Sequence, residues 1–263
     1  MTPIYKPTLA VYKFSSCDGC QLSLLNMEDE LLELAEKIEV AYFLEARRKI
    51  LPGPYDIGLV EGSISIEEEV EKIKTARRDC QVLIALGTCA TSGGLQSLRN
   101  FGDVEAYKKI VYQQPEVIEA LPTSSAIKDH VKVDFELWGC PVNKAQVLEV
   151  ITALLHDRRP VLPQHSVCQT CKQRGITCVI VSSNTPCLGP ATRAGCGALC
   201  PAVNRGCYGC FGPLPQVEIE AMLPVLRSTE RYPGEAVNLL RTISGNAPEF
   251  RQAAEIFLEM EAS

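Results

Sequence analysis

Cysteine is the residue type in this chain that is best able to do chemistry, since the sequence contains 13 of them. Eight lie close together in the second half, in a stretch that opens and closes with a Cys-x-x-Cys pair. Thiolates bind zinc and iron–sulfur clusters, and eight of them suffice for two four-ligand sites. Because four-cysteine sites suit zinc as well, the spacing alone leaves zinc and iron open. The eight are Cys168, Cys171, Cys178, Cys187, Cys196, Cys200, Cys207 and Cys210.

Four further cysteines are scattered over the first half of the chain. Cys17 and Cys20 form another Cys-x-x-Cys pair, while Cys89 and Cys140 follow much later. One interpretation is a redox-active pair at Cys17 and Cys20, with the other two as small core residues. The other is a four-thiolate site, which requires that distant segments bring the four side chains together. The predicted elements around them favour the four-thiolate site.

The first half alternates between β-strand and α-helix patterns. Apolar, β-prone runs predict five strands, and the amphipathic or charged runs between them predict helices. In the first helix Leu22, Leu25, Leu32 and Ile38 are spaced to share one face. Such alternation is typical of α/β proteins with a doubly wound parallel sheet, and we expect a flavodoxin-like domain over residues 1–157. The predicted strands are Leu9–Phe14, Val40–Leu44, Asp56–Gly62, Gln81–Gly87 and Val131–Gly139, and the helices are 21–38, Glu67–Arg78 and Asn143–Leu155.

All four first-half cysteines come directly after predicted strands. In a parallel sheet the carboxyl ends of the strands meet at one edge, where doubly wound folds bind their ligands. We therefore expect Cys17, Cys20, Cys89 and Cys140 to converge there, with Glu61 on the same edge. Neighbouring glycines would let backbone N–H groups approach the cluster sulfurs. A third four-thiolate site favours iron over zinc, because three such sites in one chain make an electron path.

The second half is organised differently. His156–Gln164 is a charged, proline-containing break, and we place a domain boundary after residue 157. Residues 165–213 show little periodicity and need metal to close them into a fold. Three short helical runs follow and could pack over this region. We expect a smaller, irregular iron–sulfur domain with short helices over residues 158–263, with the runs at 217–226, 235–243 and 249–260.

Composition and charge exclude several classes of protein. A hydrophobic content of 46%, a charged content of 22% and a net charge of -6 fit an ordinary globular protein. No Lys/Arg run is long enough to bind phosphates, so we expect no nucleic-acid partner. The N-terminal residues lack a secretory signal pattern, and no apolar run approaches the length of a membrane span. We expect a cytoplasmic chain with no membrane association, whose clustered cysteines bind metal rather than form disulfides.

Three other residues are assigned by their positions. Cys80, the odd cysteine at a helix–strand junction, is expected to be a small core residue. Trp138 is expected to pack in the core beneath the Cys140 loop. His165 lies three positions before Cys168 and is a weaker candidate for contact with a cluster. No catalytic residue is assigned to this chain.

The cysteine motifs and their surroundings resemble the small subunit of nickel–iron hydrogenases along most of the chain. SSCDGCQLSLL is similar to the family's first cluster motif and LVEGSI to its acidic loop. ALGTCATSGG and WGCPVN resemble its third and fourth ligand loops, and CLGPATRAGCGALCP with CYGC resembles its medial-cluster region. The resemblance implies three clusters. The implied ligands are Cys17, Cys20, Cys89 and Cys140 (proximal), Cys196, Cys200, Cys207 and Cys210 (medial), and Cys168, Cys171, Cys178 and Cys187 (distal).

Two features depart from the periplasmic and membrane-bound members of that family. Those relatives have a His-x-x-Cys pair at the distal site, where this chain has Cys168-x-x-Cys171. They also have a proline in place of Cys200, and their medial cluster has three irons. A fourth thiolate implies a [4Fe–4S] medial cluster with a lower potential, suited to a nicotinamide. The chain most resembles the delta subunit of cytoplasmic, heterotetrameric hydrogenases of the archaeal sulfhydrogenase or NADP-reducing type.

The resemblance also implies partners and a reaction. A nickel–iron centre in a large (alpha) subunit would split H₂ or reduce protons, and a flavin (FAD) subunit (gamma) would reduce NAD(P). An iron–sulfur (beta) subunit would complete the complex. This chain would relay electrons through three [4Fe–4S] clusters and hold no site for hydrogen chemistry. Two alternatives stay open: an iron–sulfur subunit of another reductase, quinone- or formate-linked, and a zinc-stabilised interaction module with no redox role.

Overall fold

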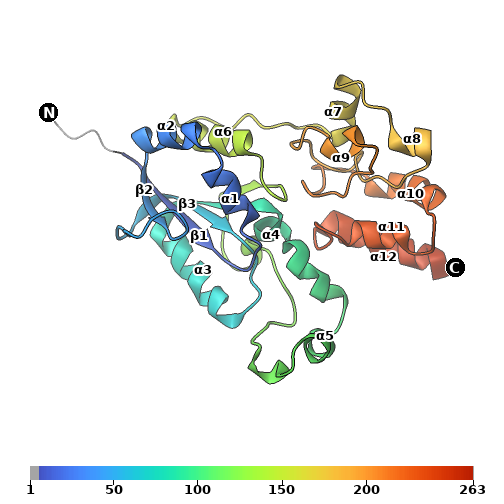
Figure 1. The fold of residues 1–263 in the computed structure, drawn as a ribbon, viewed down its shortest axis with the longest axis horizontal. Coiled ribbons are helices and arrows are strands. Elements are labelled where there is room, and N and C mark those ends of the chain that lie inside the picture. Colours follow the sequence, from blue (N-terminus) through green and yellow to red (C-terminus); the bar gives the residue numbers. More distant parts are fainter. Residues whose placement is uncertain (1–5, 263) are drawn as a thin grey trace.

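The computed structural model describes residues 6–262, with a sheet-containing first half and a second half of short helices and loops (Figure 1). The first half contains a five-stranded parallel sheet with the strand order β2-β1-β3-β4-β5. This is the flavodoxin-like doubly wound order, so the predicted fold class is confirmed. The strands are β1 (Thr8–Lys13), β2 (Glu39–Phe43), β3 (Tyr55–Glu61), β4 (Cys80–Leu86) and β5 (Phe135–Leu137).

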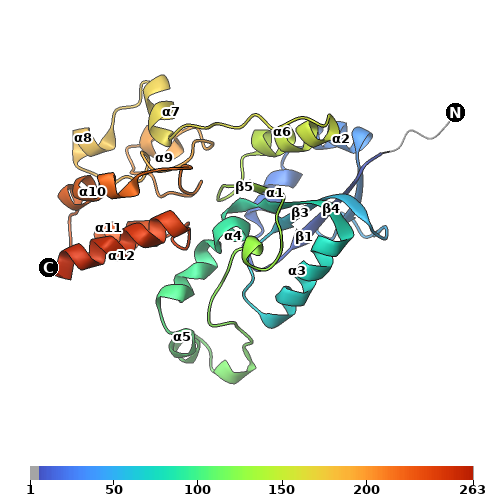
Figure 2. The same ribbon diagram turned by 180° about the vertical axis from the view of Figure 1, so that it is seen from behind.

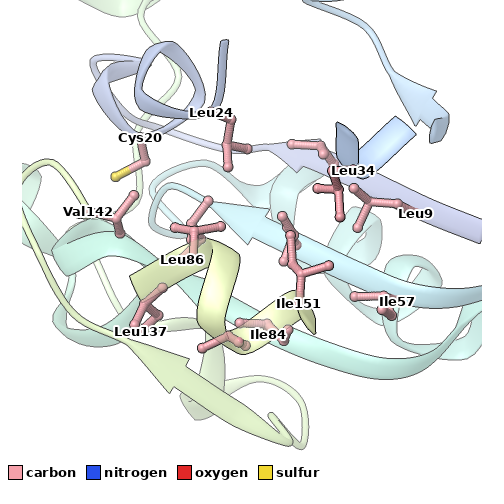
Figure 3. Packing of buried hydrophobic residues seen from close by; sticks show 14 of the residues in the cluster. Leu9, Cys20, Leu24, Leu34, Ile57, Ile84, Leu86, Leu137, Val142 and Ile151 are labelled. Atoms are coloured by element: carbon pink, nitrogen blue, oxygen red, sulfur yellow. The ribbon is translucent and has the colours of Figure 1, made fainter. Parts of the chain in front are cut away.

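Hydrophobic layers cover both faces of the sheet. On one face Leu24, Leu34 and Ile151, from three different helices, pack with alternate strand residues (Figure 3). On the other face Ile73 and Ile127 belong to a second buried cluster with the remaining strand residues. Successive strand side chains point to opposite faces, so a strand covered on both sides must be apolar throughout. The covering helices are α1 (Gly19–Leu25), α2 (Asp29–Lys37), α6 (Lys144–Leu155) and, on the second face, α3 (Glu67–Asp79).

The single helix predicted over residues 21–38 is wrong, because the chain breaks there into α1 and α2. Met27 lies at the break and is fully buried, which requires the backbone to turn inward. The predicted buried face is wrong in part: Leu22 and Leu32 are 53% and 68% exposed, whereas Ile38 is buried. Two helices with different axes do not continue one 3.6-residue period, so a pattern counted across the break fails.

The strand predicted over Val131–Gly139 is shortened to β5. Asp134 explains the late start, because its side chain takes the place of a sheet partner. Its Oδ2 accepts a hydrogen bond from the backbone N–H of Leu83 at 2.8 Å and another from Arg77 at 2.5 Å. The backbone N–H of Asp134 donates to the Leu83 carbonyl at 2.9 Å, and the regular pairing with β4 covers only the next three residues, which leaves β5 as a short edge strand.

Between β4 and β5 the chain passes through short helices that the sequence did not predict. Segments of three to eight residues contain too few turns to give a clear helical period. Figure 1 shows α5 extending away from the sheet, and no residue of α5 is buried. The elements are α4 (Gly87–Ser92), η1 (Gly94–Phe101), α5 (Val104–Val111), η2 (Pro115–Val117) and η3 (Ile127–Asp129).

The second half has its own hydrophobic core. Figure 2 shows its C-terminal helices, in red, beside the cysteine-rich segment. Leu226, Leu240 and Phe257 of three helices pack there with Leu188 of the loop region, as the helical runs predicted. The boundary after residue 157 stays a prediction. Within residues 6–262 no helix is both long and apolar enough to cross a membrane. The helices are α7 (Val167–Gln173), α8 (Val179–Ser183), α9 (Leu199–Ala202), η4 (Ile219–Met222), α10 (Leu223–Thr229), α11 (Glu235–Leu240) and α12 (Pro248–Ala262).

Candidate metal centres

The first-half cysteines lie in three loops at the carboxyl edge of the sheet. Cys17 and Cys20 follow β1, with Cys20 already in α1, while Cys89 lies in α4 directly after β4. Cys140 follows β5. The backbone N–H of Thr88 donates to the carbonyl of Gly139 at 2.8 Å, which joins the second and third loops. The topology therefore brings these loops to one edge, as the strand pattern predicted.

Close contacts show how tightly the loops meet. A methyl group placed on Gly87, whose φ is +86°, would lie 2.4 Å from the Sγ of Cys20. One placed on Gly94, whose φ is +59°, would lie 2.5 Å from the Sγ of Cys89. Only glycine tolerates both the backbone conformation and the approach of the sulfur. The sulfur atoms of Cys20 and Cys89 thus pack against the backbone of glycine residues.

The electrostatics also indicate that these four thiols are neighbours. The pKa of Cys89 is raised to about 12, mainly by burial and also by the nearby Cys140, Glu61 and Cys17. Burial is likewise the main cause of the raised pKa of Cys20, to which Glu61, Cys89 and Cys140 add. Buried thiols that resist ionisation become thiolates only beside a compensating positive charge. Iron supplies such a charge, so the donor set fits a cluster.

Glu61 is the buried acid at the same edge, as its position after β3 predicted. Its side chain is 1% exposed, and its Oε2 accepts hydrogen bonds from Ser16 at 2.7 Å and Gln21 at 3.1 Å. Burial raises the pKa of the Glu61 carboxyl, while the two donors oppose that rise. Ser16 and Gln21 were missed by sequence reasoning, although both flank the first Cys-x-x-Cys pair.

A second group of four thiols surrounds a small cavity of about 80 Å³ in the second half. Two of these cysteines lie on α7, one directly precedes α8, and the fourth lies in the loop beyond it. The fourth, Cys187, accepts backbone hydrogen bonds at its Sγ from Gly189 at 3.4 Å and from Cys207 at 3.2 Å. N–H groups directed at a ligand sulfur stabilise a cluster. The cavity is lined by Cys168, Cys171, Cys178 and Cys187.

The remaining four cysteines have electrostatic neighbours in both of the other groups. Burial raises the pKa of Cys210 to about 12, with contributions from Cys196, Cys140 and Cys200. Cys207 is more deeply buried, and its pKa is raised by burial and then by Cys187 and Cys210. Cys207 is therefore a neighbour both of Cys187, in the cavity group, and of Cys210, in its own group. The division of these eight residues into medial and distal ligands stays a prediction.

Side-chain hydrogen bonds join the first half to the cysteine-rich half. The hydroxyl of Thr88 donates to the carbonyl of Cys210 at 2.7 Å, and the amide of Asn143 donates to the carbonyl of Gly195 at 2.8 Å. Each bond connects a loop at the sheet edge to the backbone beside a second-half cysteine. Thr88 was not singled out in the sequence, although it stands next to Cys89. These bonds fix the sheet-edge thiols relative to the group that contains Cys196 and Cys210.

The other singled-out residues have local partners. Cys80 is 4% exposed at the start of β4 and packs against Gly58, where an added methyl would lie 2.4 Å from its Sγ. The Nδ1 of His165 lies 3.1 Å from the carbonyl of Ser166. Trp138 is buried, as predicted. Within residues 6–262, no group of three or more His, Cys, Asp or Glu side chains is drawn close enough to hold a single metal ion.

The fold and the thiol groups define a class of protein: an iron–sulfur electron carrier built on a flavodoxin-like sheet. Residues 17–154 match the family described as "NADH ubiquinone oxidoreductase, 20 Kd subunit". The chain is 37% identical to sulfhydrogenase 2 subunit delta of Pyrococcus furiosus, over 90% of this chain and 98% of that one. The chain therefore belongs to this family and, within it, to the small, or delta, subunits of hydrogenases.

Solved structures agree with this assignment. A chain of the NAD+-reducing [NiFe]-hydrogenase in its H2-reduced state is 30% identical, with a TM-score of 0.56, over 60% of this chain and 96% of that one. The actinobacterial-type NiFe-hydrogenase from Ralstonia eutropha H16 shares the fold over 99% of this chain and 92% of its own, at 16% identity and a TM-score of 0.55. The fold thus extends through both halves of the chain.

Proposed function

We propose that this chain relays electrons between the nickel–iron site of a hydrogenase large subunit and a flavin-containing NAD(P) reductase. Three [4Fe–4S] clusters would be held by the twelve cysteines described above. Each cluster supplies a one-electron carrier when bound. The part played by this chain's own residues is to position the thiolates, exclude water and direct backbone N–H groups at the sulfurs. The hydrogen chemistry belongs to the partner.

The observation that carries this proposal is the order of the three thiol groups in space. Cys140 of the sheet edge is an electrostatic neighbour of Cys210, and Thr88 bonds the backbone of the same Cys210. At the other end, Cys207 donates its N–H to Cys187 of the small cavity. These contacts support an order of proximal, medial and distal clusters, along which an electron could pass in steps. Independent zinc sites would have no need of this continuity.

The proximal group is the natural contact for the large subunit. Cys17 is exposed at the sheet edge, whereas Cys20 behind it is buried. A nickel–iron centre needs its own set of terminal and bridging thiolates. With twelve cysteines assigned as ligands, Cys80 is the one thiol left over, and it is buried in the core. The partner must therefore supply the nickel site.

The physiological carrier and setting are inferred from the relatives. One relative is a sulfhydrogenase subunit, and another is from an NAD+-reducing hydrogenase. The names of both relatives fit a cytoplasmic heterotetramer. In it this chain would have alpha, beta and gamma partners, and the carrier would be NADP or NAD. Cys200, the fourth thiolate of the medial group, supports a low-potential medial [4Fe–4S] cluster, which suits a nicotinamide.

Metal analysis of anaerobically purified protein tests the proposal. Three four-iron clusters require about twelve irons per chain, together with a broad visible absorption that bleaches on reduction with dithionite. Zinc as the main metal, or about four irons per chain, would contradict it. Purification from the native host tests the partner, because the chain should co-purify with a nickel-containing subunit. Recovery with a nickel-free reductase instead would support the alternative complex.

A further inference from the structure

A groove on the surface of the second half lies next to two of the thiol groups. It has a volume of about 360 Å³ and is lined by the cysteine-rich loops on one side and by residues between Arg231 and Thr242 on the other. Pro186 and Gly206, which also line it, directly precede Cys187 and Cys207. These two segments pack closely, because a methyl group on Gly206 would collide with the carbonyl oxygen of Pro186. The groove therefore reaches to within one residue of a cysteine in each second-half group.

Arginine and tyrosine side chains are prominent in this groove. Arg205 and Tyr208 come from the cysteine-rich loops. Arg231 and Tyr232 come from the turn between α10 and α11, and a wider, shallower hollow continues from them to Arg227 of α10. All five side chains are exposed. Arginine and tyrosine are enriched in the centres of protein–protein interfaces, whereas small molecules are usually bound in enclosed, mostly apolar pockets. The composition and the open shape thus favour a protein partner.

The positive charge in this groove is not neutralised by ion pairs. None of the ion pairs within residues 6–262 involves Arg205, Arg227 or Arg231. The guanidinium of Arg231 donates to the hydroxyl of Thr185 at 3.0 Å, which positions it without neutralising it. Glu235 also lines the groove, but its carboxylate accepts the backbone N–H of Arg231 at 2.7 Å. The chain has a net charge of -6, so this groove runs against its overall charge.

We propose that this groove docks an acidic segment of the subunit that accepts electrons from this chain. The inference rests on the proposed function and adds to it the place and the charge of the electron exit. Aspartate or glutamate side chains of that segment would pair with the guanidinium groups, which present parallel N–H donors to a carboxylate. The rings of Tyr208 and Tyr232 would add apolar contact area. Complementary charges speed the encounter of two proteins and fix their relative orientation.

Charge reversal in the whole complex, produced in its native host, tests this docking. The variant Arg205→Glu/Arg231→Glu would be compared with the wild type in H₂-dependent reduction of NAD(P) and of benzyl viologen. The viologen is a small dye that needs no docking groove, so the ratio of the NAD(P) rate to the dye rate isolates transfer to the partner subunit. We expect this ratio to fall at least tenfold, because like charges would face each other across the groove.

The matched control is Arg48→Glu/Arg159→Glu. It makes the same change in net charge at two exposed arginines that lie outside the groove. The ratio of the two rates should stay at its wild-type value in this variant. An iron content of about twelve per chain in both variants would show that neither substitution disturbs the clusters.

The dependence on salt gives a second test that needs no charge reversal. In the wild type the ratio of the two rates should fall as the NaCl concentration rises, because salt screens exposed charges. Arg205→Gln/Arg231→Gln removes the two charges and keeps polar side chains at both positions. The ratio in this variant should start lower and depend less steeply on salt than in the wild type.

The outcomes separate this inference from the function on which it rests. Equal ratios and equal salt dependences in the groove variants and the control would overturn the docking inference, while nickel, flavin and iron in the wild-type complex would still support the proposed function. A wild-type chain with few irons or without a nickel-bearing partner would refute the proposed function, and this inference with it. Binding of inorganic phosphate to the free chain that is lost in the groove variants, together with an unchanged rate ratio, would assign the groove to a small anion and overturn the docking.

Discussion

Replacing Gly87 with alanine should remove the proximal cluster and leave the other two in place. Gly87 has a φ of +86°, where a side chain costs about 1–2 kcal/mol relative to glycine. The added methyl would also lie 2.4 Å from the Sγ of Cys20, and ordinary contacts begin at 3.4 Å. The sulfur must therefore move by at least about 1 Å. Metal–ligand distances tolerate only about 0.2 Å, so Cys20 should be lost as a ligand.

Gly234→Ala provides a matched control. Its φ is +80°, so the backbone strain is similar, but nothing lies within 4 Å of the added methyl. Both variants should lose about 1–2 kcal/mol of stability from the backbone alone. Gly234→Ala should keep about twelve irons per chain, whereas Gly87→Ala should keep about eight. Iron and sulfide analysis of anaerobically purified protein measures the difference. Equal iron contents in the two variants would refute the reasoning that the Cys20 sulfur is a ligand fixed against Gly87.

The remaining predictions concern individual cysteines. Cys200→Pro should convert the medial cluster to a three-iron type of higher potential, seen as a new EPR signal of the oxidised protein. Cys200→Ala is the control that separates loss of the ligand from any effect of proline on α9. An unchanged cluster in both variants would show that Cys200 is not a ligand. Cys80→Ala should keep the full iron content and cost about 1 kcal/mol for the small void, measured by denaturant unfolding, so a loss of four irons would contradict its core role. Cys20→Ser in the whole complex should block electron flow from H₂ to NAD(P) or a dye, while hydrogen–deuterium exchange at the nickel site continues; unimpaired dye reduction would exclude the proximal group from the path.

The strands and the grouping of the cysteines could be predicted because both are local properties. β1, β3 and β4 have apolar centres with polar residues near their ends, and a run that is buried on both faces is recognisable without knowing its neighbours. The rule that ligands gather at the carboxyl ends of parallel strands then placed Cys89 and Cys140 together, although they are far apart in sequence. The ends of strands and helices were less predictable where the contacts of one side chain determine where the element starts or stops. Asp134 takes a backbone partner of β4 and delays β5, and buried Met27 divides the first helix.

What the tertiary structure alone decided are the contacts between residues that are distant in sequence. The bond from Thr88 to Cys210 joins positions separated by 122 residues, and no local pattern encodes it. The position of Cys207 between two thiol groups depends on how the loops of the second half fold over one another. Leu137, Leu162 and Arg193 line one cleft only because β5, the connecting segment and the cysteine-rich loops pack together. The sequence determined which residues could bind metal and which strand or helix ends they lie near, since propensity and periodicity act over a few neighbouring residues. Packing determined which of these residues meet, because burial and hydrogen bonding act between whatever side chains the fold brings into contact.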